Sequence, residues 1–469
     1  MESSHIHSDT GERHSPSFSH QIHPQTLDDE IESEAVSQAG DIGDRQISSN
    51  RYSRSGSLQY SGDDVMNVED GVVCDNNVFS TSSPVFLVPS DVVSPLSTVS
   101  MLFSTDKNQT LSGQLLKENQ SEWPRLLEYI SCLLHLAVFG ILGVFTRYFL
   151  QKLFGPTVAG ITSNQSVLYL DLPSNVVGSF LMGWLGVVFK GDICQVSDLL
   201  AIGLTTGYLG SLTTFSGWNQ KMLDLSVKGQ WVTAVLGFLV GLWIVAESLR
   251  TGVETAKGFR FLLKRFTMNS ESVKPNPRWN YRVDGFKQHL MVMVMMVLLL
   301  GFLWGVSGTL LRKRLYDGNS NAQLWLACIV APPGVWARWF FARFNGLGLG
   351  KKGVLKWIPF GTLLVNVSAA SVMAALSTVK KEASFQNPKT IYFLLNCVNT
   401  KKCDIIVTGI QFGLLGCLST VSTFIAEYHA MRESKYPWRA HAYAAITILP
   451  SFIIGTLIYS IPVWTKVHH

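Results

Sequence analysis

Long runs of apolar residues without any charge dominate the chain after its first 125 or so residues. A helix crosses the hydrocarbon of a bilayer with roughly 20 apolar residues, so such runs predict membrane-spanning helices. Six runs lack Asp, Glu, Lys and Arg altogether, namely 199–220, 229–246, 290–311, 357–379, 405–426 and 442–465. Three more have a suitable length but carry Arg147, Asp171, and Arg338 with Arg343, namely 127–150, 167–189 and 324–344. The sequence therefore predicts an all-α integral membrane protein with about nine spans.

The composition agrees with a membrane protein and argues against a soluble enzyme. Of the 469 residues only 15% are charged, whereas soluble domains have about a quarter. The net charge of +5 comes from short basic clusters beside apolar segments, a pattern that argues against nucleic acid as a partner. None of the seven cysteines forms a CxxC pair or joins histidine at zinc spacing, so we expect no metal centre of that kind. Cys397 and Cys403 are close enough in sequence to form a disulfide, although free thiols are the simpler interpretation.

The first 125 residues differ sharply from the rest, being rich in Ser, His, Asp and Glu without a helical or alternating period. They contain neither a signal peptide nor a transit peptide, and we expect a disordered tail. Its scattered histidines, among them His5 and His7, are metal ligands in one interpretation and without specific role in the other. The basic connection from Arg250 to Lys287 favours the cytoplasm, which would place the tail there too. Arg312 and its neighbours then face outward, so this charge bias is weak.

The most informative pattern is an internal repeat. At an offset of 191, Gly143 and Arg147 coincide with Gly334 and Arg338, and Asn175 coincides with Asn366. At an offset of 206, residues 203–221 align with 409–427, and seven of the 19 positions are identical. Each copy contains four predicted helices, and one helix near 290–311 separates them. An odd number of crossings between the two starts makes the copies point in opposite directions, an arrangement that places a substrate or ion site near the midplane.

These repeats define the expected domains. The tail covers 1–125, the first four-helix repeat 126–250, a basic cytoplasmic linker 251–285, a linking helix 286–312, and the second repeat 322–465. The linking helix holds Met291, Met293, Met295 and Met296 among Leu and Val, which is typical of a lipid-facing helix.

Glycines and hydroxyl residues gather in the middle of the third helix of each copy. They are Gly207, Gly210, Ser211, Thr213, Thr214, Ser216 and Gly217, mirrored by Gly413, Gly416, Ser419, Thr420, Ser422 and Thr423. This favours a break, whose freed carbonyls can coordinate a small cation. Close packing of helices through the glycines is the alternative, and the two interpretations are compatible.

Other polar residues recur at equivalent places. Asn175 and Asn366 either donate to a pathway or bind helices together. Arg147 and Arg338 either attract an anion into a vestibule, extend towards headgroups, or pair with Asp171 or carbonyls. The aromatic pair Phe215 and Trp218 corresponds to Val421 and Phe424. Rings turned edge-on can hold a bare anion, although such aromatics are ordinarily packing residues.

The segments GVFTRYFL, SNVVGSFLMG and GYLGSLTTFSGW together resemble the CrcB/Fluc fluoride channels, and the doubled arrangement looks like the eukaryotic fluoride export proteins. The match covers about residues 127–465. The resemblance implies two inverted four-helix bundles fused in one chain that acts as a monomer. It also implies that the transported ion is fluoride and that the protein is located in the plasma membrane. It also implies a structural Na⁺ held by backbone carbonyls where the broken helices cross, at Gly210, Thr213 and Thr214 with Gly416, Ser419 and Thr420.

Carried over by position, the pore residues are Asn175, Asn366, Phe215, Phe424, Ser216 and Ser422. In the family each pore takes two phenylalanines, one from each opposed bundle. If the pairing crosses in the same way here, Phe215 and Phe424 complete one pore, whereas Val421 and Trp218 leave the other degenerate. The second copy also departs from the pattern at Ala369, Ser371 and Ala374, where the first has Gly178, Phe180 and Gly183.

The function that follows is passive, fluoride-selective export with one working pore, which gives fluoride resistance. A pore must replace the tightly held water of fluoride by close donors such as amides, hydroxyls and polarised ring edges.

A secondary transporter of another small solute, coupled to protons or ions, explains inverted repeats equally well. It requires a carboxylate in the pathway, and within the spans we identify only Asp171. An intramembrane enzyme needs a nucleophile with its base, or a metal set, and His135 and His441 stand alone. A structural scaffold leaves the repeated polar residues unexplained.

Overall fold

The computed structural model describes residues 35–36, 39–40, 43, 125–163, 167–269, 286–316, 321–349, 355–384 and 400–467. Over these residues the secondary structure is helical, apart from one isolated bridge between Asn345 and Pro359. The protein is thus an all-α membrane protein, as the apolar runs predict.

The first half begins with α4 (Arg125–Phe154), a single helix of 30 residues. The second span consists of α5 (Leu172–Leu181), the π-helix η3 (Met182–Val188) and α6 (Lys190–Val196). The third comprises α7 (Asp198–Ile202), η4 (Gly203–Leu209) and α8 (Gly210–Leu212), followed after an interruption by α9 (Phe215–Val227). The half ends with α10 (Trp231–Asn269).

The linking helix is α11 (Phe286–Tyr316). The second half begins with α12 (Ala322–Phe341), continued by the short 3-10 helix η5 (Ala342–Phe344), and α13 (Phe360–Ser384). Its third span comprises α15 (Thr400–Ile410), η6 (Gln411–Leu415) and α16 (Gly416–Leu418), then α17 (Ser422–Arg432). The fourth consists of α18 (Trp438–Gly455), η7 (Thr456–Ser460) and α19 (Ile461–Val467).

Seven helices in the described part of the chain are long and apolar enough to cross a membrane, or eight if the bent unit Leu172–Val188 with Lys190–Val196 counts as one span. The remaining predicted span, 199–220, is not among them because extended backbone at Thr213 and Thr214 divides it into short helices. All nine predicted spans therefore fall on helical segments, and the difference in number comes from this interruption.

The two halves run in opposite directions. Near the end of α4, the hydroxyl of Tyr148 donates to Asn321 Oδ1, which precedes α12, at 3.2 Å. Near the other end of the same pair, Trp336 Nε1 of α12 donates to the carbonyl of Leu133 in α4 at 3.0 Å. The first helices of the halves thus pack antiparallel, which is the inversion that an odd number of crossings predicts.

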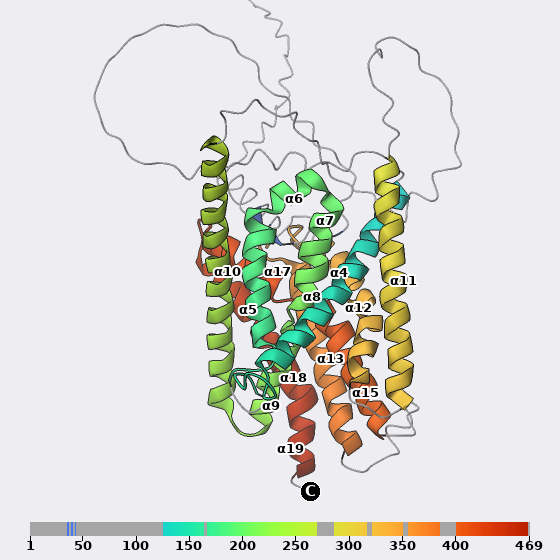
Figure 1. Cartoon of the computed structure of the whole chain (residues 1–469). Coiled ribbons are helices and arrows are strands. Elements are labelled where there is room, and N and C mark those ends of the chain that lie inside the picture. Colours follow the sequence, from blue (N-terminus) through green and yellow to red (C-terminus); the bar gives the residue numbers. More distant parts are fainter. Residues whose placement is uncertain are drawn as a thin grey trace, which may run out of the picture. The chain divides into compact units, whose positions relative to one another are not determined.

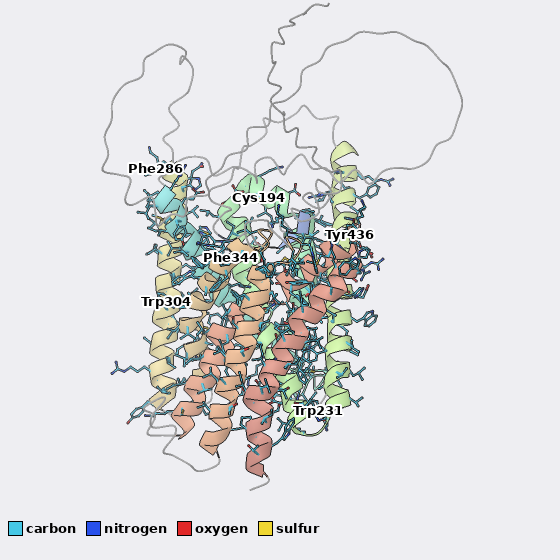
Figure 2. The ribbon with its side chains drawn as sticks, turned by 180° about the vertical axis from the view of Figure 1, so that it is seen from behind. Cys194, Trp231, Phe286, Trp304, Phe344 and Tyr436 are labelled. Carbon is cyan, nitrogen blue, oxygen red and sulfur yellow. The ribbon has the colours of Figure 1, made fainter. Side chains whose placement is uncertain are left out.

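Figure 1 shows α10 and α11 on opposite flanks of the bundle, with the other spans between them. Only 17% of the most apolar window of α11 is buried, in keeping with a lipid-facing helix. Figure 2 places Trp231, at the start of α10, at the end of the bundle opposite Phe286, Cys194 and Tyr436.

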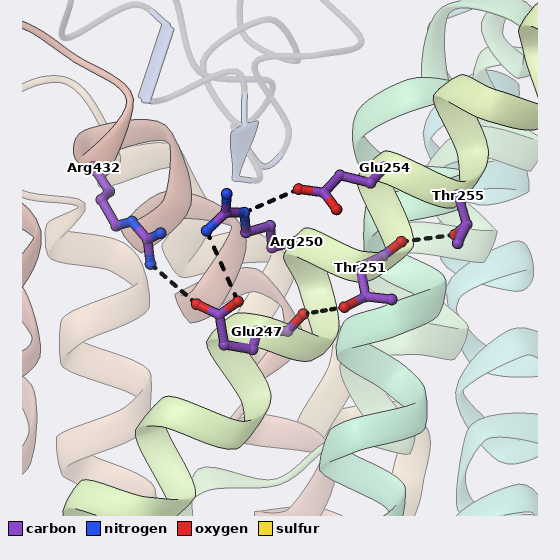
Figure 3. Close-up of polar contacts among 6 residues, drawn as sticks. All are labelled: Glu247, Arg250, Thr251, Glu254, Thr255 and Arg432. Carbon is purple, nitrogen blue, oxygen red and sulfur yellow. Dashed lines mark hydrogen bonds and ion pairs between the residues drawn. The ribbon is translucent and has the colours of Figure 1, made fainter.

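An ion-pair network links the halves at the end of the bundle where Phe286, Cys194 and Tyr436 lie. Glu247 of α10 lies 3.6 Å from Arg432 of α17 and 4.0 Å from Arg250 (Figure 3). Arg250 in turn contacts Glu254 at 3.0 Å. These side chains are all partly exposed, so the network joins the halves at the bundle surface.

The few described tail residues include Val36, which is 2% exposed and packs into the hydrophobic core. The disordered tail that the composition predicts stays a prediction. The five described cysteines, Cys403 among them, are thiols and not part of a disulfide. Cys397 and the tail histidines lie outside the described residues.

Candidate functional site at the crossing of the two halves

Each third span is interrupted at the point where it meets its counterpart. Thr213 and Thr214 are extended, as is Ser419 in the second half. Ser and Thr side chains compete with helical hydrogen bonding, and here the Thr214 hydroxyl accepts from the amide of Gly217 at 3.4 Å as the cap of α9. The sequence of hydroxyl residues after the glycines thus ends one helix and starts the next.

The hydroxyl groups of the two interruptions form a buried cluster of two mirrored groups. Ser216 Oγ and Ser419 Oγ are 2.9 Å apart, and Thr214 Oγ1 lies 3.2 Å from Ser419 Oγ. On the other side, Thr213 Oγ1 lies 3.1 Å from Ser422 Oγ and 3.3 Å from Thr420 Oγ1. The structure therefore brings together the residues predicted at the two breaks, and it places Ser216 and Ser422 in this cluster.

The two asparagines hold the interrupted backbone in mirrored fashion. Asn175 Oδ1 accepts from the Thr214 amide at 2.8 Å, while its Nδ2 donates to the Thr214 carbonyl at 3.2 Å and to the Tyr169 hydroxyl at 3.0 Å. Asn366 contacts the amide and carbonyl of Thr420 in the same way, at 2.8 and 3.0 Å. Both amides thus bind the breaks together, the structural alternative that the sequence leaves open.

The two arginines reach across to the opposite half. Arg147 donates to the carbonyl of Phe412 at 2.5 Å, and Arg338 donates to the carbonyl of Thr206 at 2.6 Å. Both are buried, at 1% and 3% exposure, so they occupy the protein interior rather than an open vestibule. Of the alternatives for these arginines, pairing with carbonyls is the one that the structure has.

Glycine is needed where the arginines pass. A Cβ at Gly416 would collide with the Arg147 guanidinium, and one at Gly210 with the Arg338 guanidinium. The helix-packing interpretation also applies, since a Cβ at Gly207 would lie 2.9 Å from Phe139 Cβ. Break and packing therefore coexist in the same glycine-rich segments.

The aligned positions Phe215, Trp218, Val421 and Phe424 differ in their neighbours. The rings of Phe215 and Phe424, one from each half, lie 6.2 Å apart and are fully buried. Tyr443 lies beside Phe424, at 5.2 Å between ring centroids. Trp218 contacts Phe215 edge-on at 6.0 Å between ring centroids, and it stacks on Tyr169 at 6.1 Å with an angle of 4° between the rings. Val421, also fully buried, adds no ring.

A polar stripe that sequence reasoning missed follows the Phe215 and Phe424 pair along α18. It consists of Tyr443, Thr447 and Ser451, spaced four residues apart and fully buried. The Thr447 and Ser451 hydroxyls donate to the carbonyls one turn earlier, at 2.9 and 2.7 Å. Asn219 of the first half reaches the Ser451 carbonyl at 3.4 Å. The spacing of these hydroxyls within the run 442–465 is the signal that would have found them.

Sequence reasoning also missed a buried carboxylate. Glu427 is fully buried and accepts hydrogen bonds from Thr362 Oγ1 at 2.7 Å, Tyr443 OH at 2.7 Å and Asn345 Nδ2 at 3.3 Å. The repeat offset of 206 pairs it with Lys221. The uncharged run 405–426 ends one residue before Glu427, which is why a count of apolar runs passes over it. Asp171 is therefore not the sole acid buried near the crossing.

The family comparison matches both halves of the chain. The family described as "CrcB-like protein, Camphor Resistance (CrcB)" matches residues 134–253 and 325–458. The chain belongs to the CrcB family. The two matched segments correspond to the two inverted halves, and α11 lies between them. It is a multi-pass membrane protein of a family of fluoride channels and exporters, not of enzymes.

Relatives of this CrcB protein are of two lengths. It is 34% identical over 122 residues to the "Fluoride-specific ion channel FluC" of Geobacter metallireducens, a match that covers 26% of this chain and 94% of that protein. It is 26% identical over 344 residues to "Fluoride export protein 2" of Saccharomyces cerevisiae, covering 65% of this chain and 86% of the yeast protein. "Fluoride export protein 1" of the same yeast is 25% identical over a stretch of equal length. No solved structure matched the chain.

Proposed function

We propose that this chain is a passive, fluoride-selective channel that exports F⁻ from the cytosol and so gives fluoride resistance. The observation that carries the proposal is the buried pair of Phe215 and Phe424, contributed by opposed halves and lying beside the hydroxyl stripe of α18. The names of the relatives support fluoride as the ion. One chain supplies both halves, so we propose that the monomer is sufficient, and we propose the plasma membrane as its place.

The chemistry of the pair suits a small, strongly hydrated anion. Ring edges carry partial positive charge, and hydroxyl groups donate hydrogen bonds, so both replace water around F⁻ without a full positive charge that would hold it too tightly. The hydroxyls of Tyr443, Thr447 and Ser451 lie one turn apart on α18, with Tyr443 beside Phe424. They donate to Glu427 and to backbone carbonyls, so each hydroxyl must turn from that partner to donate to F⁻. Fluoride that enters a cell as HF ionises in the more neutral cytosol, and the membrane potential then drives the anion out through a passive pore.

We propose that only this one pathway conducts. The equivalent place on the other side of the crossing has Val421 and Trp218, and the Trp218 ring is stacked on Tyr169 and packed against Phe238 at 5.7 Å. The α10 positions that the offset of 206 aligns with the stripe are Gly237, Gly241 and Val245, which have no hydroxyl groups. Both the ring pair and the donors are thus lost on that side.

We propose a structural Na⁺ at the crossing of the breaks. Its candidate residues are Gly210, Thr213, Thr214, Gly416, Ser419 and Thr420. The donor set fits a small hard cation, because α8 and α16 both end at the crossing with carbonyls that point beyond their last turn, surrounded by hydroxyl oxygens. Within the described residues no three His, Cys, Asp or Glu side chains form a metal cluster, so oxygen atoms of these residues would supply the ligands. A bound cation would hold the two half-helix ends together against the repulsion of their dipoles.

Glu427 supports a second candidate, a proton-coupled transporter. Such a carrier needs a buried carboxylate on its pathway, and Glu427 lies one turn from Phe424 and accepts from Tyr443. Its bonds to Thr362, Asn345 and Tyr443 also suit a purely structural carboxylate that orders the polar groups of a channel.

The test is fluoride efflux from liposomes that contain the purified chain, with chloride as the control anion. A channel releases F⁻ with no other gradient present and at a rate set by the membrane potential. Flux that requires a proton gradient, and that loses this requirement in Glu427→Gln, would instead establish the carrier. Absence of fluoride flux under both conditions would contradict both candidates.

A further inference from the structure

Part of the amino-terminal tail lies inside the membrane bundle at the end where Glu427 is located. Val36 is 2% exposed and belongs to the same core cluster as Phe424 and Tyr428. Gly40 and Gly43 are also buried, and the Gly40 amide donates to the Val36 carbonyl at 3.3 Å. We call Val36, Ala39, Gly40 and Gly43 the docked tail residues. They are drawn in blue near α6 in Figure 1.

The docked tail residues lie directly against the candidate pathway. Gly40 is so close to Glu427 that a Cβ there would collide with the carboxylate and lie 2.9 Å from its Cγ. Ala39 and Gly40 line a small void together with Thr423, the residue before Phe424. Thr423 and Glu427 lie one residue before and three residues after Phe424 on α17, so the tail contacts the helical turn that carries Phe424.

Both halves contribute to this docking place. From the first half, Met182, Gly186, Lys190 and Thr205 line the same void, and Lys190 Nζ donates to the Gly40 carbonyl at 3.4 Å. From the second half, the carbonyl of Trp339 and the amide of Arg343 approach Gly43 so closely that a Cβ would lie 2.5 and 2.6 Å from them. Gly43 has a φ of 62°, a conformation that favours glycine.

We propose that the docked tail residues close the mouth of the pathway beside Glu427, so that the tail is an autoinhibitory segment that must leave before the anion passes. This rests on the proposed function, because closure has a meaning only if the pathway conducts. It lies at the end bearing the 250–287 connection, whose basic residues favour the cytoplasm, so we propose that the regulated mouth is the cytoplasmic one.

The experiment compares the full chain with two displaced variants and one matched control. Val36→Asp places a charge in the core cluster, and Gly43→Val forces a branched side chain against the backbone of α12 and η5. The control is Ala35→Asp, which adds the same charge at a neighbouring exposed position. Hydrogen exchange of the peptide that covers 35–43 reports docking without reference to transport, and fluoride efflux from liposomes reports closure.

We expect Val36→Asp and Gly43→Val to lose exchange protection at 35–43 by about tenfold or more and to raise the fluoride flux several-fold, while Ala35→Asp behaves as wild type. Absence of protection in the wild type, or loss of protection with unchanged flux, would overturn the proposal. If protection changes as expected but no protein conducts fluoride, the proposed function fails and closure fails with it, whereas the docking itself stands.

Discussion

Arg147 of the first half donates to the carbonyl of Phe412 in the second half at 2.5 Å, and its guanidinium lies 4.4 Å from the centre of the Phe412 ring. Arg338 repeats the first of these contacts in the opposite direction, to Thr206. The halves are therefore fastened by two buried cations, each of which approaches the π-helical turn that precedes the break of the other half.

We predict that Arg147→Met lowers the stability of the protein, because it leaves a buried carbonyl without its donor at a cost of roughly 1–3 kcal/mol. Thermal unfolding in detergent measures the loss. Arg250→Met is the surface control, since its side chain is 50% exposed. A melting temperature for Arg147→Met equal to that of Arg250→Met would contradict the anchoring role.

The same contact predicts the effect of a single methyl group at Gly416. Gly416→Ala should destabilise the protein by about 1–3 kcal/mol, because the added Cβ collides with the Arg147 guanidinium. Gly301→Ala on α11 is the matched control, since nothing lies within 4 Å of a Cβ there. Equal unfolding temperatures of the two alanine variants would show that Arg147 moves aside freely.

The aromatic asymmetry predicts unequal effects of three substitutions. Phe215→Ile and Phe424→Ile should abolish fluoride efflux from liposomes, because each removes one ring of the buried pair. Trp218→Ile should change the flux little, because its ring packs on Tyr169. Similar losses in all three would refute the single-pathway assignment.

Replacement of N-methylglucamine by Na⁺ in the buffer tests the proposed cation at the crossing. A cation that binds only the folded protein raises its stability with concentration, by about 2.7 kcal/mol at a hundredfold excess over Kd. The melting temperature should therefore rise with Na⁺ when N-methylglucamine keeps the ionic strength constant. A melting temperature that does not respond to Na⁺ would exclude a structural role for the ion.

Inversion of the halves predicts that equivalent connections face opposite sides. Residue 230 follows the third span of the first half, and residue 435 follows the third span of the second. An impermeant maleimide should label Gln230→Cys from outside intact cells and Lys435→Cys only after permeabilisation, with the unsubstituted chain as background. Labelling of both from one side would remove the basis for a shared crossing.

Sequence reasoning predicted the architecture because its signals are long and repeated. Apolar runs fix the spans, and the offsets of 191 and 206 reveal the inversion without any structure. It also brought the hydroxyl residues of the two breaks together correctly, since mirrored positions of inverted halves meet at their common axis. Thr213 contacts Ser422 at 3.1 Å, and their repeat counterparts Ser419 and Ser216 contact each other at 2.9 Å.

The sequence alone could not predict the hydrogen-bond partner of each polar side chain. Asn175 has the same composition signal whether it faces a pathway or the Thr214 backbone, and only the packing of α5 against the break decides between them. Glu427 fell outside the uncharged window, and Val36 lies in a segment whose composition predicts disorder. Burial of both depends on residues more than 50 positions away in the sequence.

The repeat offset of 206 aligns Lys221 with Glu427, and such a difference between equivalent positions is one that a single continuous polypeptide permits. In an assembly of two identical subunits every change is made twice, so a residue that improves one route alters its twin as well. Here the covalent connection through α11 frees the two copies from that restraint. The two copies can then diverge at equivalent positions, and the opposite charges of Lys221 and Glu427 are one such divergence.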